Sequence, residues 1–501
     1  MPSDASVVFH DVSFRYDTAG DPLFAALSVH FPRGFTGIVG ANGAGKTTLL
    51  RLATGGLVPV QGTIQAPGGA IYCAQRTDDP PGGLAALLEA DDGEAYSLRG
   101  RLGVERDFIS RWSSLSHGER KRAQIAAALW RAPALLAIDE PTNHIDSEAR
   151  RLLMRALERY RGVGLLVSHD RDLLDTLCAQ CLWLEPPEAK LIPGGYGRAK
   201  AQRDSDHASA GRERDRARRE RDRLHREVVT RREQASRSHR DRSKRGLALK
   251  DHDSRFRKNL ARVTGKDARA GRLLRQLEGR SGRAEARLEA AHVDKTYELG
   301  IWLPGSRSPR STLFHVEAGS IPLGGGRLLH FPHLAMRADE RVAITGPNGS
   351  GKTTLVRHIL ANANLPEGKL TAMPQEVDAA LGAEILQQAR ALAPESLGHA
   401  MNVVSRLGSR PARLLESVEP SPGEIRKLLL ALGMARAPHL IVMDEPTNHL
   451  DLPSIECLEN ALADCPCGLL LVSHDERFLD RLDTKRWHIE GDGQGDSQLT
   501  R

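Results

Sequence analysis

The sequence predicts an α/β protein in which one domain occurs twice, with a long, charged α-helical hairpin between the two copies. Two observations support this prediction. Short motifs recur at nearly constant spacing: Lys46 and Lys352 are 306 residues apart, and Asp139 and Asp444 are 305 apart. Between the copies lies a strongly basic segment without proline. We expect the first domain at residues 1–197, the hairpin linker at 198–291, and the second domain with its N-terminal tether at 292–501.

Composition limits the class of protein. A hydrophobic fraction of 40% is ordinary for a globular chain of two or three domains. The chain begins without the basic and apolar regions of a secretory signal, and no stretch approaches the roughly 18 consecutive apolar residues of a membrane-spanning helix. We therefore expect a cytoplasmic protein without membrane insertion. The six cysteines lack zinc-ligand spacing, even in the closest pairs, Cys178/Cys181 and Cys465/Cys467, so we expect reduced thiols packed as small apolar groups.

Short apolar runs alternate with helical patterns in both copies. Such runs between helices are typical of parallel strands that are buried on both faces. The predicted strands lie at residues 35–39, 135–138 and 165–167 in the first copy, and at 341–345, 440–443 and 469–472 in the second.

A glycine-rich loop ending in Lys-Thr follows the first of these strands in each copy and leads into a helical pattern. Its glycines let backbone N–H groups converge on phosphate oxygens, the lysine reaches the β- and γ-phosphates, and the threonine hydroxyl can ligate Mg²⁺. We therefore predict two sites for ATP and Mg²⁺. The phosphate-binding residues are Gly40, Asn42, Gly43, Gly45, Lys46, Thr47 and Thr48 in the first copy, and Gly346, Asn348, Gly349, Gly351, Lys352, Thr353 and Thr354 in the second.

A carboxylate pair ends another strand in each copy. Asp139 and Asp444 close apolar runs, and Glu140 and Glu445 follow directly. In phosphoryl transfer the aspartate holds Mg²⁺, directly or through water, and the glutamate polarises the attacking water. Because a buried carboxylate pair without a cation is unfavourable, binding of Mg·ATP accounts for the arrangement.

Further motifs make the chain similar to ATP-binding cassette proteins, and especially to their ABC-F subfamily. Residues 115–119, Leu-Ser-His-Gly-Glu, resemble the superfamily signature, and the runs 139–146 and 444–451 are closest to ABC-F. The resemblance covers nearly the whole chain, including the charged connector. The family's switch histidine is matched by His169 and His474, and its Q-loop glutamine by Gln75 and Gln375.

In that family the two cassettes close head to tail, and ATP lies between the phosphate loop of one and the signature of the other. The resemblance implies a monomer with two such sites. One site would combine Lys46, Gln75, Asp139, Glu140 and His169 with Ser421 and Gly423, and the other Lys352, Gln375, Asp444, Glu445 and His474 with Ser116 and Gly118. The catalytic residues would be Glu140, Glu445, His169 and His474, and the Mg²⁺ ligands Thr47, Gln75 and Asp139 in one site and Thr353, Gln375 and Asp444 in the other.

Two departures predict that the sites are unequal. The second signature reads Pro420-Ser421-Pro422-Gly423-Glu424, so Pro422 removes an N–H donor, although proline suits the first turn of a helix. Tyr16 resembles the aromatic residue that stacks on adenine, with a half-buried strand residue as the alternative. The comparable stretch 320–323 has no ring, so we expect apolar contact alone to hold adenine there. We expect the Lys46 site to hydrolyse ATP differently from its partner.

The connector holds 29 Lys and Arg against 15 Asp and Glu between residues 200 and 291, whereas the whole chain carries a formal charge of +7. Arg, Glu and Ala at helical spacing predict a helix over 212–245, and a helix of about 40 residues is about 60 Å long. A second helix follows, with an apolar stripe of Leu273, Leu274, Leu277 and Leu288. We expect a hairpin with an irregular basic tip at 244–266; a solvated charged spacer is the alternative.

The resemblance implies an ATPase that acts on the ribosome, with residues of about 200–291 reaching rRNA and tRNA near the exit and P sites. A thin, basic hairpin with few aromatic residues suits phosphate backbones. ATP would hold the bound form and hydrolysis would release it. A general translation factor and a factor that protects ribosomes from an antibiotic both fit. Two other classes are alternatives. The energising subunit of a transporter is opposed by the basic insertion between the copies, and a DNA-associated ATPase is opposed by the missing zinc-binding cysteine pairs.

Overall fold

A computed structural model describes residues 6–17, 21–143, 145–241, 266–290, 306–363, 365–366, 368–375, 377–407, 409, 411–416, 421–448, 450–491 and 495–501. These residues fall into two compact units. One unit contains the residues up to Ala199 and those from Ser306 onward, called here the first half and the second half, and the other contains those from Lys200 to Ala290. The predicted tip (244–266, apart from Lys266) and Pro420 lie outside the described residues.

The first half contains a six-stranded sheet in the order β5-β6-β7-β3-β8-β9, parallel except for β9, and an antiparallel sheet in the order β2-β1-β4. Its elements are β1 (Val7–Phe14), β2 (Phe24–Phe31), β3 (Gly34–Gly40), α1 (Lys46–Ala53), β4 (Gln61–Gln65), β5 (Ala70–Cys73), α2 (Leu84–Glu89), α3 (Gly93–Leu102), the 3₁₀ helix η1 (Trp112–Ser114), α4 (His117–Trp130), β6 (Leu135–Asp139), α5 (Ser147–Leu157), β7 (Val163–Val167), α6 (Arg171–Leu177), β8 (Cys178–Glu185) and β9 (Glu188–Pro193).

The second half repeats the order of the six central strands, as β15-β16-β17-β14-β18-β19, and adds β12 and β11 to the same sheet. Its large sheet has the order β11-β12-β19-β18-β14-β17-β16-β15, and β10 pairs separately with β13. Its elements are β10 (Thr312–Val316), β11 (Gly319–Gly324), β12 (Arg327–Phe331), β13 (Leu334–Arg337), β14 (Arg341–Thr345), α10 (Lys352–Asn362), β15 (Leu370–Met373), α11 (Ala379–Arg390), α12 (Pro394–Arg406), α13 (Pro411–Glu416), α14 (Pro422–Ala435), β16 (Leu440–Asp444), α15 (Leu452–Ala463), β17 (Gly468–Val472), α16 (Glu476–Arg481), β18 (Lys485–Gly491) and β19 (Ser497–Thr500).

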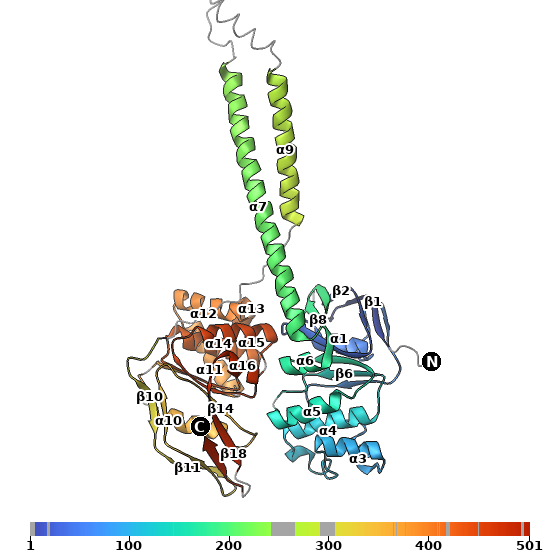
Figure 1. The fold of residues 1–501 in the computed structure, drawn as a ribbon, viewed down its shortest axis with the longest axis vertical. Coiled ribbons are helices and arrows are strands. Elements are labelled where there is room, and N and C mark those ends of the chain that lie inside the picture. The colour runs from blue at the N-terminus through green and yellow to red at the C-terminus, as the bar shows by residue number, and fades with distance from the viewer. Residues whose placement is uncertain are drawn as a thin grey trace, which may run out of the picture. The chain divides into compact units, whose positions relative to one another are not determined.

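The central strands are mainly apolar because both faces of each sheet are covered. In β6, Leu136 and Ile138 join one hydrophobic cluster while Leu135 and Ala137 join the cluster on the opposite face. Helices α3, α4 and α5 gather together in the first half, and α11 to α15 in the second (Figure 1). All six predicted runs lie in parallel strands of these sheets, so the predicted α/β fold with a duplicated domain is confirmed.

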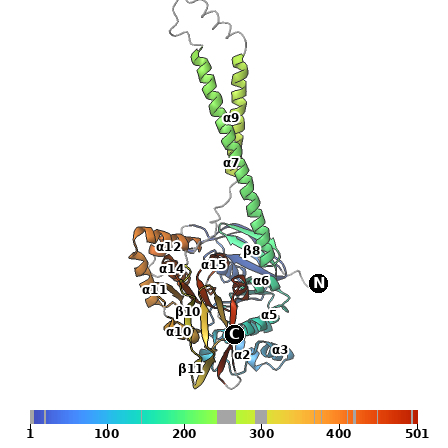
Figure 2. The same ribbon diagram turned by 60° about the vertical axis from the view of Figure 1, so that its left-hand side comes forward.

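The predicted hairpin is confirmed in its described part: α7 (Tyr196–Asp241) and α9 (Lys266–Ala290) lie side by side (Figures 1 and 2). With 46 residues, α7 is about 69 Å long at 1.5 Å per residue. It begins well before the predicted start at residue 212. The residues from 196 to 211 have no Arg–Glu pattern, but no proline interrupts them either, so the helix extends through them.

A small apolar contact holds the two hairpin helices together. Leu224 and Val228 of α7 pack with Leu277 and Ala284 of α9. The predicted stripe is wrong at Leu273, which is 42% exposed.

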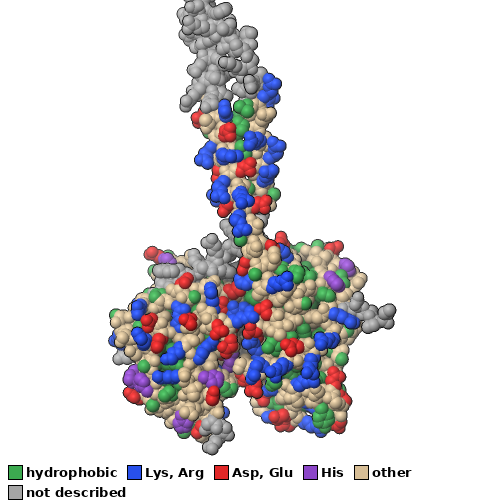
Figure 3. Space-filling view, in the orientation of Figure 1, with side chains coloured by type: hydrophobic (Ala, Val, Ile, Leu, Met, Phe, Trp, Pro, Cys, Tyr) green, Lys and Arg blue, Asp and Glu red, His purple; other side chains and the backbone are tan. Residues whose placement is uncertain are grey.

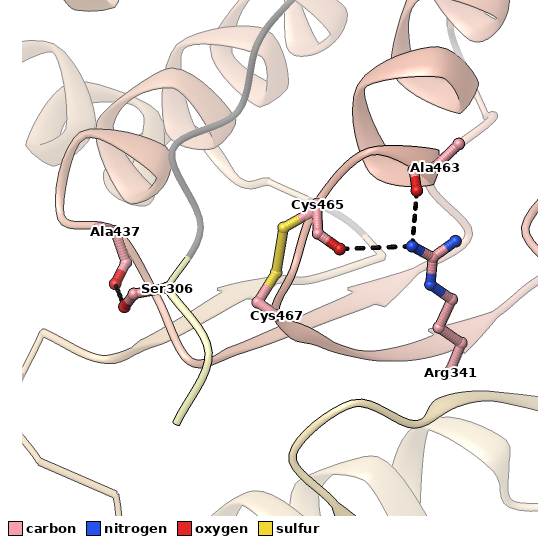
Figure 4. The surroundings of a disulfide bond; sticks show 6 residues. All are labelled: Ser306, Arg341, Ala437, Ala463, Cys465 and Cys467. Atoms are coloured by element: carbon pink, nitrogen blue, oxygen red, sulfur yellow. Dashed lines mark hydrogen bonds between the residues drawn. A yellow bond between two sulfur atoms is a disulfide. The ribbon is translucent and has the colours of Figure 1, made fainter. Parts of the chain in front are cut away.

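One cysteine pair also differs from expectation. Cys465 and Cys467 form a disulfide in the turn between α15 and β17, with their Cα atoms 5.5 Å apart (Figure 4). Pro466 turns the chain between them and brings the two thiols within reach of each other. Arg341 supports this turn by donating hydrogen bonds to the carbonyls of Ala463 (2.7 Å) and Cys465 (3.3 Å). Among the described residues, the other four cysteines form no disulfide and are buried, as expected.

Candidate functional site

The two glycine-rich loops each connect a strand to a helix, β3 to α1 and β14 to α10. The helices begin at Lys46 and Lys352, and the preceding Gly45 and Gly351 have φ angles of 93° and 99°. A Cβ on Gly45 would lie 2.9 Å from side-chain carbons of the apolar residues behind the loop. Glycine is therefore required both by the left-handed backbone and by the close packing, and the first N–H groups of each helix stay available to an anion.

Both loop lysines fold over their own loops. The Nζ of Lys46 donates to the carbonyls of Gly40 (2.8 Å) and Ala41 (3.1 Å), and the Nζ of Lys352 donates to the equivalent carbonyls at 2.8 and 2.9 Å. Burial lowers the pKa of Lys46, although the carboxylates of Glu140 and two nearby aspartates oppose the shift. Each ammonium group is thus fixed beside the loop N–H groups, where a phosphate would bind.

A hydroxyl and a carboxylate meet at the mouth of each loop. The Oγ1 of Thr47 donates to Oδ2 of Asp139 at 2.7 Å, and Thr353 donates to Oδ2 of Asp444 at 2.6 Å. Both aspartates are buried at the ends of their strands. Mg²⁺ in nucleotide sites binds to oxygen ligands of this kind, one or two from the protein and others from phosphates and water, so these residues fit the ion.

Glu140 and Glu445 follow these aspartates in an unusual backbone conformation. Their φ angles are 47° and 48°, left-handed values that are costly for a residue other than glycine. The backbone N–H of Glu140 donates to Val167 (2.9 Å), and that of Glu445 donates to Val472 (2.8 Å). The same strain in both copies turns each carboxyl away from its strand. Burial raises the pKa of both carboxyls to about 8.

The two histidines lie beside these glutamates. The Nε2 of His169 is 3.1 Å from Oε1 of Glu140, and the Nε2 of His474 is 3.6 Å from Oε1 of Glu445. Among the residues that the structure describes, neither Oε1 receives a hydrogen bond of good geometry. Burial, and then the charge of Lys352, lowers the pKa of His474 to about 4, so its imidazole is neutral near pH 7.

The signature serines cap two helices. Ser116 accepts a hydrogen bond from the backbone of Glu119 at the start of α4, and Ser421 accepts one from Glu424 at the start of α14. Pro422 is the first residue of α14, so the prediction that proline would not disturb the helix is confirmed. Gly118 lies in the first turn of α4, where a Cβ would be 3.3 Å from Ile145. Gly423 occupies the same place in α14.

The structure brings one predicted site together across the two halves. A cavity of about 900 Å³ is lined by Ser116 of the first half and by the loop, aspartate, glutamate and histidine of the second. Of the predicted residues, it is lined by Ser116, His169, Asn348, Gly349, Gly351, Lys352, Thr353, Thr354, Gln375, Asp444, Glu445 and His474.

The residues that the first half contributes to the other predicted site are assembled around Lys46, and a contact there crosses to the second half. The backbone N–H of Asn42 donates to Oδ2 of Asp451 at 2.7 Å, and in the reverse direction the N–H of Asn348 donates to Asp146 at 3.5 Å. We had assigned no role to these two aspartates. They are the last residues of the repeated runs 139–146 and 444–451 and are 305 residues apart, and this regular spacing indicates an equivalent role in the two copies.

Two buried cations were also missed. Lys121 in α4 donates to the carbonyl of Gln75 at 3.2 Å, and Arg426 in α14 donates to the carbonyl of Gln375. The side chains of both glutamines are exposed. The two cations therefore hold the glutamine loops through their backbone. Their 305-residue spacing is again the regularity that reveals them.

Tyr16 lies beyond the end of β1, so the strand alternative is wrong. Its hydroxyl is 2.8 Å from Oγ1 of Thr48, and its ring, 43% exposed, packs edge-on against Phe14. In the second half, Leu323 and Arg327 line the cavity around Lys352, and Arg327 donates to the carbonyl of Gly349 at 2.6 Å. The expectation of apolar contact alone therefore overlooked a guanidinium group beside that loop.

Comparison with known proteins agrees with this geometry. A family model described as "ABC transporter" matches residues 25–143 and 329–448. The chain is 28% identical to the ribosome protection protein VmlR of Bacillus subtilis, over 95% of this chain and 86% of that protein. It is 30% identical to the tylosin resistance ATP-binding protein TlrC of Streptomyces fradiae, over 94% and 95% of the two chains.

A solved structure of an RNase-L inhibitor has the same fold, with a TM-score of 0.61 and 19% identity, over 98% of this chain and 90% of that one. The paired motifs and the similarity to full-length relatives lead to one conclusion. The chain belongs to the ABC-F subfamily of ATP-binding cassette proteins.

Proposed function

We propose that this protein hydrolyses ATP at two sites between its halves, and that the nucleotide controls its action on the ribosome. The cavity around Lys352 carries the proposal, because it joins one half's phosphate loop and catalytic glutamate to the other half's signature serine. Closure of the halves would complete this site, so occupancy and conformation would be linked.

Each residue has a defined task in this proposal. Lys352 neutralises charge on the β- and γ-phosphates, and Ser116, with the start of α4, faces the γ-phosphate. Glu445 orients the attacking water and accepts its proton; its raised pKa suits a general base working near neutral pH. Thr353 and Asp444 would hold Mg²⁺, which when bound neutralises developing charge on the phosphates. At the other site Lys46, Glu140, Thr47 and Asp139 would have the same tasks, with Ser421 of the second half as the signature serine.

The hairpin is the proposed ribosome-binding element. Lys and Arg side chains run along both helices, with Asp and Glu between them (Figure 3). With 29 basic and 15 acidic residues, the segment from 200 to 291 has a net positive charge that suits the phosphate backbone of rRNA and tRNA. Among the described residues, no helix is long and apolar enough to span a membrane. We propose the linker at residues 198–291, between cassettes at 1–197 and 292–501.

Protection of the ribosome against an antibiotic is the role that we favour. Two relatives that match nearly the whole chain bear the names ribosome protection protein and tylosin resistance protein. A general role in translation is the other outcome of the tests below.

The central experiment is cosedimentation of Glu140→Gln/Glu445→Gln protein with ribosomes, with and without ATP. We expect this variant to remain in the ribosomal pellet in ATP and to leave it without nucleotide, because hydrolysis no longer releases it. Glu188→Gln/Glu395→Gln is the matched control, since both residues are exposed outside the sites. Absence of the blocked variant from the pellet in ATP would contradict the proposal.

A second experiment separates the two roles. Purified protein is added to in vitro translation inhibited by ribosome-targeting antibiotics, and compared with a variant lacking residues 244–266. Rescue of inhibited translation by the intact protein, but not by the shortened variant, supports protection. A change in uninhibited translation without any rescue supports a general factor.

A further inference from the structure

We propose that Tyr72 is a positioning residue that fixes Asp139 for Mg²⁺, and that it gives the Lys46 site a higher affinity for the metal than the Lys352 site. The inference rests on the proposed ATP sites and adds a difference between them. It concerns a residue outside the motifs that define such sites.

The contact that carries the inference is a hydrogen bond. The hydroxyl of Tyr72 donates to Oδ2 of Asp139 at 3.0 Å, and this same oxygen accepts from Thr47 at 2.7 Å. Asp139 is 2% exposed. Two donors on one carboxylate oxygen fix the torsion angle of the side chain, and Oδ1 is bound by neither of them.

The second half lacks this donor. In the first half Tyr72 pairs with Ala137, two residues before Asp139, and in the second half Ala372 pairs with Val442, two residues before Asp444. Strand register therefore makes Ala372 the counterpart of Tyr72. Among the described residues, Asp444 accepts at Oδ2 from Thr353 only.

The tyrosine is itself held in place. It lies in β5, and the guanidinium of Arg51 lies over its ring at 5.9 Å from the centroid. A phenol hydroxyl keeps its proton at neutral pH, so it can donate to Asp139. Arg51 is matched by Arg357, each five residues after its loop lysine, so the difference here between the halves is the tyrosine.

Groups that orient a metal ligand from outside the coordination sphere typically contribute about 10- to 100-fold in metal affinity. Here the hydroxyl orients a carboxylate that would otherwise be held by one threonine. It does so at the Lys46 site alone, so Mg²⁺ should bind there at lower concentration than at the Lys352 site.

The test measures binding of a fluorescent ATP analogue as Mg²⁺ is varied, and again in EDTA. Full-length Lys352→Ala protein reports the Lys46 site. Adding Tyr72→Phe should raise the Mg²⁺ concentration at half-maximal binding about 10-fold, with unchanged affinity in EDTA. Tyr72→Ala should have the same effect, since it reproduces the second half. Tyr160→Phe, which removes another half-buried hydroxyl that donates to a carbonyl at 2.9 Å, should change neither value.

The reciprocal Lys46→Ala protein reports the Lys352 site. Adding Tyr72→Phe to it should leave the Mg²⁺ concentration at half-maximal binding unchanged. An unchanged Mg²⁺ midpoint in Lys352→Ala/Tyr72→Phe would overturn the inference and leave the proposed function intact. An equal loss of affinity in Mg²⁺ and in EDTA would also overturn it, because Tyr72 would then support the fold and not the metal. If Lys352→Ala protein bound no nucleotide while the unsubstituted protein did, ATP binding would stand but the Lys46 site would not, and the inference would fail with it.

Discussion

The ion pair between Arg171 and Glu459 tests how the two halves are held together. Arg171 of α6 donates to both carboxylate oxygens of Glu459 in α15, at 3.1 and 2.5 Å, and lies 3.5 Å from Asp475. The Arg171 and Glu459 side chains are 10% and 7% exposed. Burial raises the pKa of Glu459 even though Arg171 opposes the shift. For this carboxylate, burial and the charges of Asp475 and Glu456 together therefore outweigh the pairing with Arg171.

This balance predicts a particular pattern of stability. Arg171→Met leaves a buried carboxylate without its partner and should lower the free energy of unfolding by about 3 kcal/mol. Glu459→Met should cost less, about 2 kcal/mol, because Asp475 remains near the guanidinium. The double variant removes both buried charges and should lie within about 1 kcal/mol of the unsubstituted protein.

The assay is equilibrium unfolding in urea, followed by tryptophan fluorescence and by circular dichroism so that coincident transitions can be verified. Arg307→Met is the control, because its ion pair with Asp339 is 67% and 50% exposed and should not affect stability measurably. A double variant whose loss equals the sum of the single losses would refute the reasoning, since the two charges would then act independently.

Three other changes follow from local geometry. Gly45→Ala should reduce ATP affinity at least about 10-fold in a fluorescent-analogue titration, because its φ of 93° and its packed surroundings exclude a Cβ. Leu277→Ala should lower the stability of the hairpin by about 2 kcal/mol, whereas Leu273→Ala, at a 42% exposed position, should change it little. Hydrogen exchange, used to monitor the thermal unfolding of α9, distinguishes the two variants. Replacing Cys465 and Cys467 by alanine should cost only about 1.5 kcal/mol in urea unfolding, because the disulfide closes a three-residue loop.

The sequence predicted those features of the fold and the site that depend only on residues close together in the chain. The buried strands were found because apolar runs between helices are distinctive, and the phosphate loops because their glycines, lysine and threonine act within eight residues. The repeat then supplied the second copy of every motif. For the same reason, Pro422 was correctly expected to start a helix: its fixed φ is a local property.

Contacts between distant residues were not predictable in this way. Tyr72 reaches Asp139 across 67 residues, and the contact depends on strand register, which no local pattern specifies. The hydroxyl of Tyr196 donates to Glu456, 260 residues away, and this contact depends on how the halves pack. The disulfide was missed for a different reason: thiols two residues apart meet only if the turn between them is tight, and composition does not show this.

The halves also differ in how they contact each other. Helix α15 begins after Asp451, which accepts from the phosphate loop of the first half at Asn42. One turn later, Glu456 accepts from the hydroxyl of Tyr196 at 2.7 Å, and Tyr196 is the first residue of α7. A shift of α15 relative to the Lys46 loop would therefore act directly on the residue from which the hairpin starts.

The equivalent helix of the first half is not built this way. In α5, Asp146 accepts from the second phosphate loop at a longer 3.5 Å, and a basic residue, Arg151, stands where α15 has Glu456. Among the described residues, α15 thus contacts both the Lys46 loop, through Asp451, and the first residue of the hairpin helix, through Glu456, whereas α5 has Arg151 at the position of Glu456. Tyr72 and Thr47 both donate to Asp139 beside the same loop, so two of the differences between the halves concern the residues around Lys46.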